Sequence, residues 1–344
     1  MHVSACRSAA RKASRRHVHR ALALACAFAF LPAVALAGGA DEETAATDAH
    51  ALSAKTVNSA DATGGDAGLL RAQVLLDRAW FSPGEIDAGA GSNTRRAIAA
   101  YQRSRDLPDS GELDDATWKS LNANAPDVLV RYTVTAGDAA GPYARLPDDM
   151  MEKAKLDTLG YASALEMLAE KFHASPKLLQ RLNPVAAFGK AGTRLLVPNV
   201  AGVGELGKAA KVVVDKSDSS VAVLDEDGKT IAQFPASTGS EHDPLPLGQW
   251  KIEGVARDPE FHYNPDLFWD ADAGHGKATI PAGPNNPVGV VWIDLSKPHY
   301  GIHGTPEPSH VGKTESHGCI RLTNWSARAL AGAVAPGTPA ILQE

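Results

Sequence analysis

The chain has 344 residues, 44% of them hydrophobic and 22% charged, which is enough for two or three domains with cores of their own. Its formal net charge of −6 argues against a nucleic-acid partner, because a protein of that class needs clustered basic residues to neutralise phosphates. We therefore expect a multidomain protein that does not bind nucleic acid.

Residues 1–37 have the composition of an export signal. All six basic residues of this segment precede an apolar run from Ala21 to Leu36, the segment has no acidic residue, and Ala37 completes an A-x-A cleavage site. The apolar run is too short to span a bilayer, so we expect cleavage near Ala37, release into a periplasm and no stable membrane insertion afterwards. The rest of the chain then has 28 basic and 40 acidic residues, a net charge of −12, and Cys319 as its single cysteine. A single cysteine excludes an internal disulfide.

Residues 38–68 are mostly Ala, Asp, Thr, Ser and Gly, a composition that predicts a disordered linker. Residues 69–124 then predict three short helices. Apolar residues recur at helical spacing from Leu69 to Trp80, and a second helix is expected from Thr94 to Arg105. Asp114 is a suitable N-cap for the third. The segment resembles the three-helix peptidoglycan-binding module. The alternative is a helical spacer that binds nothing.

Residues 130–200 predict a strand, two helices and a second strand. Tyr132 to Asp138 alternates like a strand, Ser163 to Phe172 is amphipathic, and Ser175 with Pro176 is a typical helix start. This α+β order resembles the LysM module, which binds glycans that contain N-acetylglucosamine. An insertion of about twenty residues after Asp138 departs from that module and is expected near the start of its first helix. Glycan binding and a purely architectural role therefore both stay open.

Residues 209–343 predict a mostly β domain, separated from the helical modules by a Gly-rich join at 202–208. Strands are expected at 212–214, 221–224, 230–236 and 290–295, and a helix at 325–334. Asp227-Gly228 is a hairpin turn signal. A Pro- and Asp-rich stretch from 259 to 276 contains aromatic residues, which either cover a cleft as a lid or pack down onto the sheet.

The segment from Tyr300 to Asn324 contains the residues best suited to chemistry. A thiol flanked by Gly and His suits nucleophilic catalysis, because a nearby imidazole can lower the thiol pKa and accept its proton. Here Cys319 follows His317 and Gly318, and a second His-Gly pair, His303-Gly304, precedes it. Gly318 leaves room for backbone N–H groups beside a developing oxyanion.

The order of these residues resembles the signature of the L,D-transpeptidase (YkuD) family, which has HG, a spacer and [ST]HGC followed by an apolar and a basic residue. The segments STG at 237–239, PLPLG at 244–248 and PAGPNNPVG at 281–289 also match, so the resemblance covers about residues 209–342. It implies Cys319 as the nucleophile and His303 as the base. It further implies that the Gly304 carbonyl accepts the second imidazole N–H.

The other residues of the signature have less certain roles. His317 lies two residues before the thiol, so on an extended segment it would face the same side and support the oxyanion or substrate. A supporting role outside the substrate contacts is equally open. Arg321 suits the carboxylate of a diaminopimelate residue, with a structural ion pair as the alternative. Ser316 and Thr305 are expected to contact substrate. His299, His303, His310 and His317 match no known set of metal ligands, so we expect no metal and no cofactor.

Resemblance and residue chemistry together predict an exported cysteine acyltransferase that acts on peptidoglycan stem peptides and contacts glycan strands. The acyl-enzyme would be transferred to an amine, forming 3–3 cross-links or attaching protein during wall remodelling. Two alternatives stay open: a carboxypeptidase or hydrolase that uses the same Cys-His pair, and a catalytically dead wall-binding protein. The sequence does not distinguish the acceptor amines or the oligomeric states.

Overall fold

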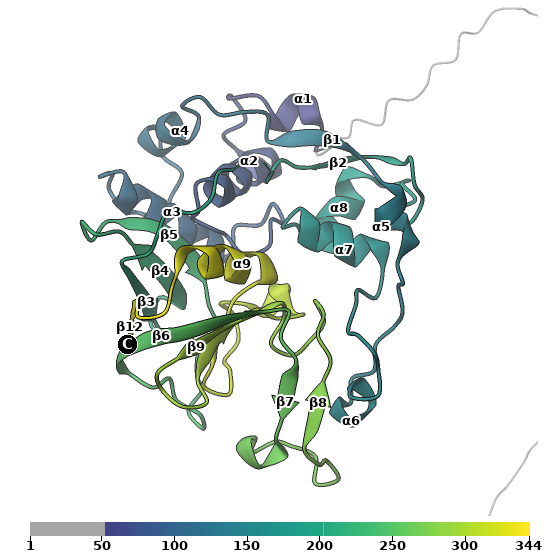
Figure 1. The fold of residues 1–344 in the computed structure, drawn as a ribbon. Coiled ribbons are helices and arrows are strands. Elements are labelled where there is room, and N and C mark those ends of the chain that lie inside the picture. Colours follow the sequence, from purple (N-terminus) through teal and green to yellow (C-terminus); the bar gives the residue numbers. More distant parts are fainter. Residues whose placement is uncertain (1–51, 202) are drawn as a thin grey trace, which may run out of the picture. The chain divides into compact units, whose positions relative to one another are not determined.

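The computed structural model describes residues 52–201 and 203–344 (Figure 1). The predicted signal peptide and residues 38–51 of the predicted linker lie outside the described residues. Residues 49–344 group together as one unit, with helices and a small sheet in the N-terminal part and a large sheet in the C-terminal part.

The prediction of a disordered linker is wrong for residues 52–68. Helix α1 (Ala54–Val57) lies in this range, and Val57 is fully buried in the hydrophobic core. The side chain of Asn58 donates to the carbonyl oxygen of Leu129, 3.0 Å away and 71 positions later. One apolar anchor and one long-range amide contact therefore order a segment whose composition is otherwise that of a linker.

The three predicted helices of the bundle are confirmed. They are α2 (Gly65–Arg78), α3 (Ser92–Ser104) and α4 (Asp115–Leu121). The side chain of Asp114 accepts the Thr117 N–H at 2.7 Å and caps α4 as expected. Helix α2 begins at Gly65, before the predicted start, and Ala67 in its first turn packs against the core.

The predicted order of strand, helix, helix and strand is also confirmed. Its elements are β1 (Leu129–Thr133), α7 (Ala164–Lys171), α8 (Pro176–Leu182) and β2 (Arg194–Pro198), with α5 (Ala136–Ala140) and α6 (Met150–Lys153) inside the insertion. β1 and β2 pair antiparallel. One hydrophobic core runs from Val57 to Val197, so the bundle and this segment share a core instead of forming two independent modules.

The C-terminal part is built on an eight-stranded sheet in the order β11-β10-β9-β6-β12-β3-β4-β5. The strands are β3 (Lys211–Asp215), β4 (Ser220–Leu224), β5 (Thr230–Pro235), β6 (Gly248–Arg257), β9 (Val291–Leu295), β10 (Gly301–His303), β11 (Ile320–Arg321) and β12 (Pro339–Gln343). Helix α9 (Asn324–Ala333) packs on the sheet through Ala327 and Leu330. The four strands and the helix expected from the sequence are confirmed within one residue at each end.

A second hairpin, β7 (Phe261–Tyr263) and β8 (Ala278–Ile280), extends beside α6 between β6 and β9 (Figure 1). Its aromatic side chains pack against Leu159 and the methionines of α6. The Leu159 N–H donates to the Ala282 carbonyl at 2.9 Å. The insertion after Asp138 therefore packs against this hairpin, whereas the sequence placed it at the start of α7.

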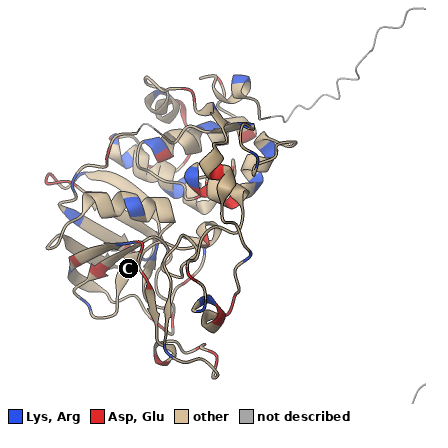
Figure 2. Ribbon diagram, turned by 45° about the vertical axis from the view of Figure 1, so that its right-hand side comes forward, with Lys and Arg blue, Asp and Glu red and all other residues tan. Residues whose placement is uncertain are grey.

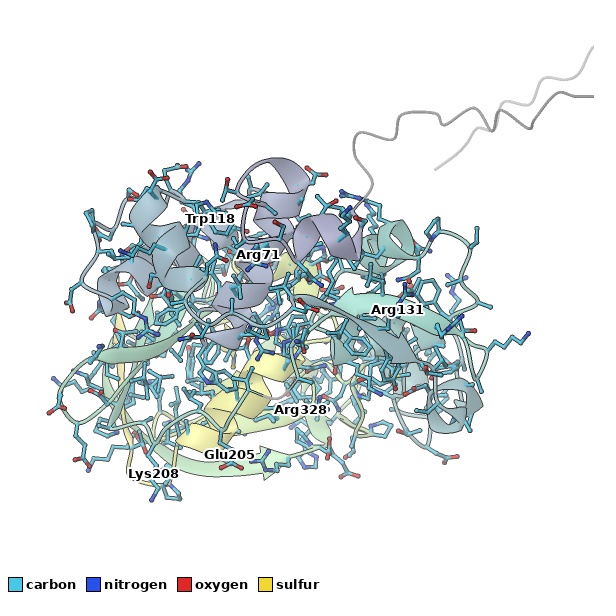
Figure 3. All side chains as sticks on the ribbon, turned by 90° about the horizontal axis from the view of Figure 1, so that it is seen from above. Arg71, Trp118, Arg131, Glu205, Lys208 and Arg328 are labelled. Atoms are coloured by element: carbon cyan, nitrogen blue, oxygen red, sulfur yellow. The ribbon has the colours of Figure 1, made fainter. Side chains whose placement is uncertain are left out.

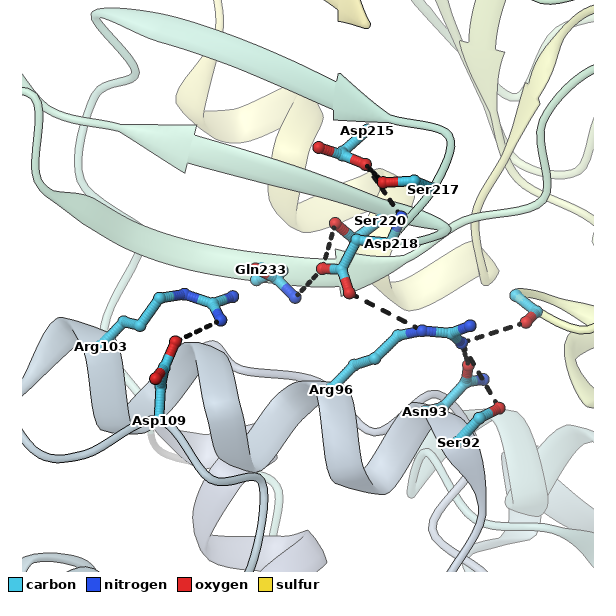
Figure 4. Close-up of polar contacts among 11 residues, drawn as sticks. Ser92, Asn93, Arg96, Arg103, Asp109, Asp215, Ser217, Asp218, Ser220 and Gln233 are labelled. Carbon is cyan, nitrogen blue, oxygen red and sulfur yellow. Dashed lines mark hydrogen bonds and ion pairs between the residues drawn. The ribbon is translucent and has the colours of Figure 1, made fainter. Parts of the chain in front are cut away.

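The expectation that the join at 202–208 separates the helices from the sheet is wrong. The chain after α2 docks on the free edge of β5, where the Ser82 N–H donates to the Gln233 carbonyl at 2.9 Å and Phe81 is 2% exposed. Figure 4 shows α3 lying under β4 and β5, with Arg96 3.8 Å from Asp218. Covering an edge strand in this way removes unpaired backbone groups that would otherwise invite association.

Basic and acidic residues are interspersed along the helices and the sheet instead of gathering by sign (Figure 2). Within residues 52–201 and 203–344, no helix combines the length and the apolar composition needed to cross a bilayer.

Candidate active site

Strands β10 and β11 bring together the two halves of the signature. They pair in parallel, with His303 opposite Arg321. Residues that pair across neighbouring strands face the same side of the sheet, so both side chains lie on one face. Cys319 immediately precedes β11, two residues before Arg321. The pairing thus brings the segment that carries Cys319 alongside the segment that carries His303, 16 positions earlier.

The imidazole of His303 is held in one orientation. Its side chain is buried at 4% exposure and stacks on the Trp292 ring, with 5.5 Å between the ring centroids. Its Nδ1 lies 2.6 Å from the Gly304 carbonyl oxygen, the contact that the family resemblance implies. A carbonyl only accepts, so Nδ1 carries the proton and Nε2 keeps its lone pair. Burial lowers the pKa of His303 to about 4, and the positive charge of Arg321 acts in the same direction. The ring is therefore a neutral base at neutral pH.

The thiol of Cys319 is protonated in this state. Burial raises the pKa of Cys319, although a backbone hydrogen bond from Gly301 and the charge of Arg321 lower it in part. The Sγ atom lies 3.8 Å from the His299 carbonyl oxygen, and in the described residues it has no hydrogen bond to the His303 ring. The sequence predicted a lowered thiol pKa, and the structure contradicts this because desolvation outweighs the nearby positive charge. Proton transfer to His303 then requires the thiol to turn away from His299.

Gly318 is required by the backbone on two grounds. Its φ of +95° lies in the left-handed region, and a Cβ at this position would lie 2.8 Å from the Tyr300 ring. In the described part of the chain, the N–H groups of residues 317–319 make no hydrogen bond to protein. Unpaired donors beside the sulfur are the arrangement that an oxyanion needs.

The chain bends from 317 to 319 and is not extended there. The expectation that His317 faces the same side as the thiol, which assumed an extended segment, therefore does not apply. Its Nε2 lies 3.0 Å from Asp270 Oδ1, in the loop between β7 and β8. Its Nδ1 lies 3.4 Å from the Arg321 guanidinium. Phe268 and Trp269 pack against the same ring, at centroid distances of 5.4 and 6.0 Å. His317 therefore joins the active-site segment to the hairpin.

The guanidinium of Arg321 lies close to both reacting groups without an acidic partner. Its charge acts on Cys319 and on His303, and burial lowers its own pKa from the ordinary value. Of the carboxylates in residues 52–201 and 203–344, none lies within ion-pair distance of it. The structural ion pair that the sequence left open is thus not formed in the described chain, and Arg321 has donors free for an anionic group.

Ser316 and Thr305, expected as substrate contacts, instead make internal contacts. Ser316 is 5% exposed and its hydroxyl donates to the Cys319 carbonyl, while its N–H donates to the Thr238 carbonyl at 2.8 Å. Thr305 is 6% exposed and its hydroxyl oxygen accepts the Glu307 N–H. These contacts shape the loops around the thiol, and substrate contact by Ser316 and Thr305 stays a prediction.

The aromatic residues of 259–276 neither form a simple lid over a cleft nor pack onto the main sheet. Phe261, Tyr263 and Phe268 pack against the insertion that carries α6, not against the main sheet. Trp269 is 63% exposed, and its ring lies tilted against His242 with 4.7 Å between the centroids. The tip of the hairpin thus borders the active site beside His317.

Sequence reasoning missed several residues that shape the site. Trp292 fills the space beside Gly301, where a Cβ would lie 2.5 Å from its ring. Asp270 and Tyr300 contact the segment that carries the thiol, and Glu170 reaches the site from the LysM-like segment. Trp292, Asp270 and Tyr300 could have been found as aromatic or acidic residues close to the signature in the sequence. Nothing in the sequence distinguishes Glu170. In the chain that the structure describes, His, Cys, Asp and Glu side chains form no group of three suited to a metal ion.

A mixed sheet that presents a thiol, a neutral imidazole and an unpaired guanidinium on one face defines a catalytic domain. The model described as "L,D-transpeptidase catalytic domain", YkuD, matches residues 209–342, so this part of the chain is similar to that family. A model described as "Putative peptidoglycan binding domain" matches residues 66–121. Together the two matches support an enzyme that acts on peptidoglycan. The resemblance of residues 130–200 to LysM stays a prediction.

Proteins with curated names agree with this assignment. The chain is 28% identical over 176 residues to "Putative L,D-transpeptidase YkuD" of Bacillus licheniformis, a match that covers 51% of this chain and 90% of that protein. It is 28% identical over 180 residues to "Probable L,D-transpeptidase ErfK/SrfK" of Escherichia coli, covering 51% and 57%. The crystal structure of L,D-transpeptidase 3 from Mycobacterium tuberculosis is 18% identical, with a TM-score of 0.33 over 44% of this chain and 68% of that chain, a likeness too low to add to the assignment.

Proposed function

We propose that the chain is an exported L,D-transpeptidase that forms a thioester between Cys319 and a peptidoglycan stem peptide. The observation that carries this proposal is the parallel pairing that sets His303 opposite Arg321, with Cys319 immediately before the second strand, in a domain that matches the family. Export to the periplasm follows from the composition of residues 1–37.

The first half of the reaction is acyl transfer to the enzyme. The thiol proton moves to Nε2 of His303, and Sγ attacks the carbonyl carbon of the third stem residue. Unpaired N–H groups at 317–319 stabilise the oxyanion. As the C–N bond to D-alanine breaks, the imidazolium returns its proton to the leaving amine. A neutral His303 with its proton held on Nδ1 by Gly304 is suited to this role.

The second half consumes the thioester. An acceptor amine, most simply the side-chain amine of a neighbouring stem, attacks the thioester carbonyl. His303 takes a proton from that amine and returns it to the departing sulfur, which regenerates the thiol. The product is a 3–3 cross-link. Arg321 binds the carboxylate of the diaminopimelate residue, because its guanidinium has donors that no described carboxylate occupies.

The test is incubation of the chain, without its predicted signal peptide, with tetrapeptide stems, followed by mass spectrometry. Cross-linked dimers support transfer, whereas tripeptides alone identify a carboxypeptidase in which water replaces the amine. Unchanged stems, together with unchanged stems from Cys319→Ser, identify a wall-binding protein without activity. A protein substrate in place of the acceptor stem tests attachment of protein by the same chemistry.

A further inference from the structure

Asn324 is built into the turn that holds His303. It is fully buried and is the first residue of α9, after the N-cap Thr323. Its Oδ1 accepts the Val290 N–H at 3.2 Å. The same oxygen lies 2.2 Å from where a Cβ on Gly304 would be. The amide of Asn324 therefore occupies the space beside the residue whose carbonyl orients the imidazole.

The orientation of this amide is set by what its nitrogen meets. Nδ2 donates to the Glu170 carboxylate at 2.8 Å and to the Pro284 carbonyl at 3.1 Å. An amide with two acceptors on one end must turn its oxygen the other way. The oxygen consequently faces Val290 and Gly304, where it accepts an N–H and packs against the glycine.

Glu170 does not belong to the catalytic domain. It lies on α7 in the LysM-like segment, 154 positions before Asn324, and its side chain is 10% exposed. Its second oxygen accepts the Tyr161 hydroxyl at 2.9 Å and lies 3.5 Å from the Arg328 guanidinium. Arg328 is labelled on α9 in Figure 3. Burial raises the pKa of Glu170, while the donors from Asn324 and Tyr161 hold it down.

Burial of the Glu170 carboxylate does not imply that it stabilises the fold, because apolar residues of similar size at such positions often give equal stability. What this carboxylate does specifically is fix the amide that packs on Gly304. The contacts form one path from α7 to the imidazole: Glu170 to Asn324, Asn324 to Gly304, and Gly304 to His303.

We propose that Glu170 is a positioning residue for the catalytic His303, supplied to the catalytic domain by the LysM-like segment. The inference rests on the proposed function for its kinetic readout, but not for its spectroscopic one. It means that the catalytic domain is complete only when α7 is docked on it. If α7 moved when the N-terminal part contacts peptidoglycan, the side-chain amide of Asn324 would transmit that movement to His303.

The experiment compares Glu170→Ala with Glu166→Ala in the full chain without its predicted signal peptide. Glu166 is the matched control, because it also lies on α7 and accepts a hydrogen bond across the interface, from Asn285 at 2.6 Å, yet does not touch Asn324. We expect Glu170→Ala to lower kcat on tetrapeptide stems by roughly ten- to a hundredfold, the scale for small displacements of a catalytic group, with KM changed less than about twofold. Glu166→Ala is expected to keep kcat within about threefold. Glu170→Gln retains an acceptor for Asn324 and is expected to restore most of kcat.

The second readout is the tautomer of His303, measured by NMR on chain labelled with ¹⁵N-histidine and assigned with His303→Gln. Wild type and Glu166→Ala should show the proton on Nδ1, and Glu170→Ala should show a mixture of both tautomers. If Glu170→Ala does not fold, Glu170→Asp replaces it, since its shorter side chain keeps the charge and loses the contact with Asn324.

Two results would overturn the inference. One is a pure Nδ1 tautomer in the Glu170 variant. The other is that Glu170→Ala and Glu166→Ala both lose kcat, each in proportion to its loss of thermal stability. If wild type leaves all stems unchanged, the proposed function fails, while the tautomer comparison still decides the role of Glu170.

Discussion

The side-chain oxygen of Asn324 lies 2.2 Å from the position that a Cβ on Gly304 would occupy. Asn324 is fully buried and bonded at both ends of its amide, so it cannot move aside. Glycine at 304 is therefore needed for packing as well as for the backbone contact to His303.

Gly304→Ala should destabilise the chain by about 1–3 kcal/mol, the usual cost of overpacking, and should lower activity further by displacing the carbonyl that orients His303. Gly332→Ala is the control, because a Cβ there meets nothing within 4 Å and the residue lies inside α9. That control should raise stability by up to about 1 kcal/mol, as expected for Gly to Ala in a helix. Thermal unfolding measures both. Equal stability for Gly304→Ala and wild type would show that Asn324 moves aside to make room for the added Cβ.

The buried imidazole makes stability depend on pH. His303 has a folded-state pKa of about 4, below the ordinary value of 6.5, so the unfolded chain binds more protons between these values. Stability is therefore full above pH 6.5 and is lost as the pH falls toward 4. The shift corresponds to about 3 kcal/mol at most. Urea unfolding of wild type and His303→Gln from pH 4 to 7 measures this difference. The two proteins should converge in acid, and parallel curves would contradict a lowered pKa for His303.

The raised pKa of Cys319 predicts how the thiol reacts with a carbapenem, which offers a strained amide as an acyl donor. Acylation should continue to speed up above pH 8.5, the ordinary pKa of a thiol, because more thiolate forms as the pH approaches the raised value. Cys319→Ser should not turn over. His303→Ala should acylate about a hundredfold more slowly at neutral pH, the usual scale for a lost general base. Mass spectra at several pH values measure all three.

His317→Ala is the informative comparison in the same assay. Its ring contacts Asp270 and Arg321, so we expect a milder loss than for His303→Ala. If wild type and His303→Ala acylate equally fast across neutral pH, His303 is not the base, and His317 becomes the candidate.

Removing the helices should affect the catalytic domain. The sequence predicts a β domain separated from the helices by the join at 202–208, which would fold alone. In the structure, residues 81–82 cover the β5 edge, and the Asn93 side chain donates to the Val311 carbonyl at 2.9 Å. We now expect the fragment to unfold at a lower temperature than the full chain and to self-associate through β5. Size-exclusion chromatography and thermal unfolding test this. A monomeric fragment with the unfolding midpoint and activity of the full chain would show that the interface is dispensable.

The same fragment tests wall binding by the N-terminal part. The full chain should pellet with isolated sacculi, and the fragment should stay in solution. Equal pelleting of the two would make the helical part a spacer.

The sequence by itself predicted the candidate reacting residues and most of the regular elements. The order of His303, Gly304, Ser316, His317 and Cys319 within one short segment is a local pattern, and so are the helical spacing of α2 and the N-cap at Asp114. Such features depend on residues close together in the chain, where side-chain period and capping chemistry operate directly.

Only the tertiary structure decided the state of the site. Burial raised the thiol pKa against the expected direction, and the loop between β7 and β8 brought Asp270 to His317. Residues 52–68 became ordered through Val57 and Asn58, and Glu170 met Asn324 across 154 positions. Desolvation and contacts between distant segments depend on how the chain packs as a whole, so the local composition from which a sequence is interpreted does not contain them.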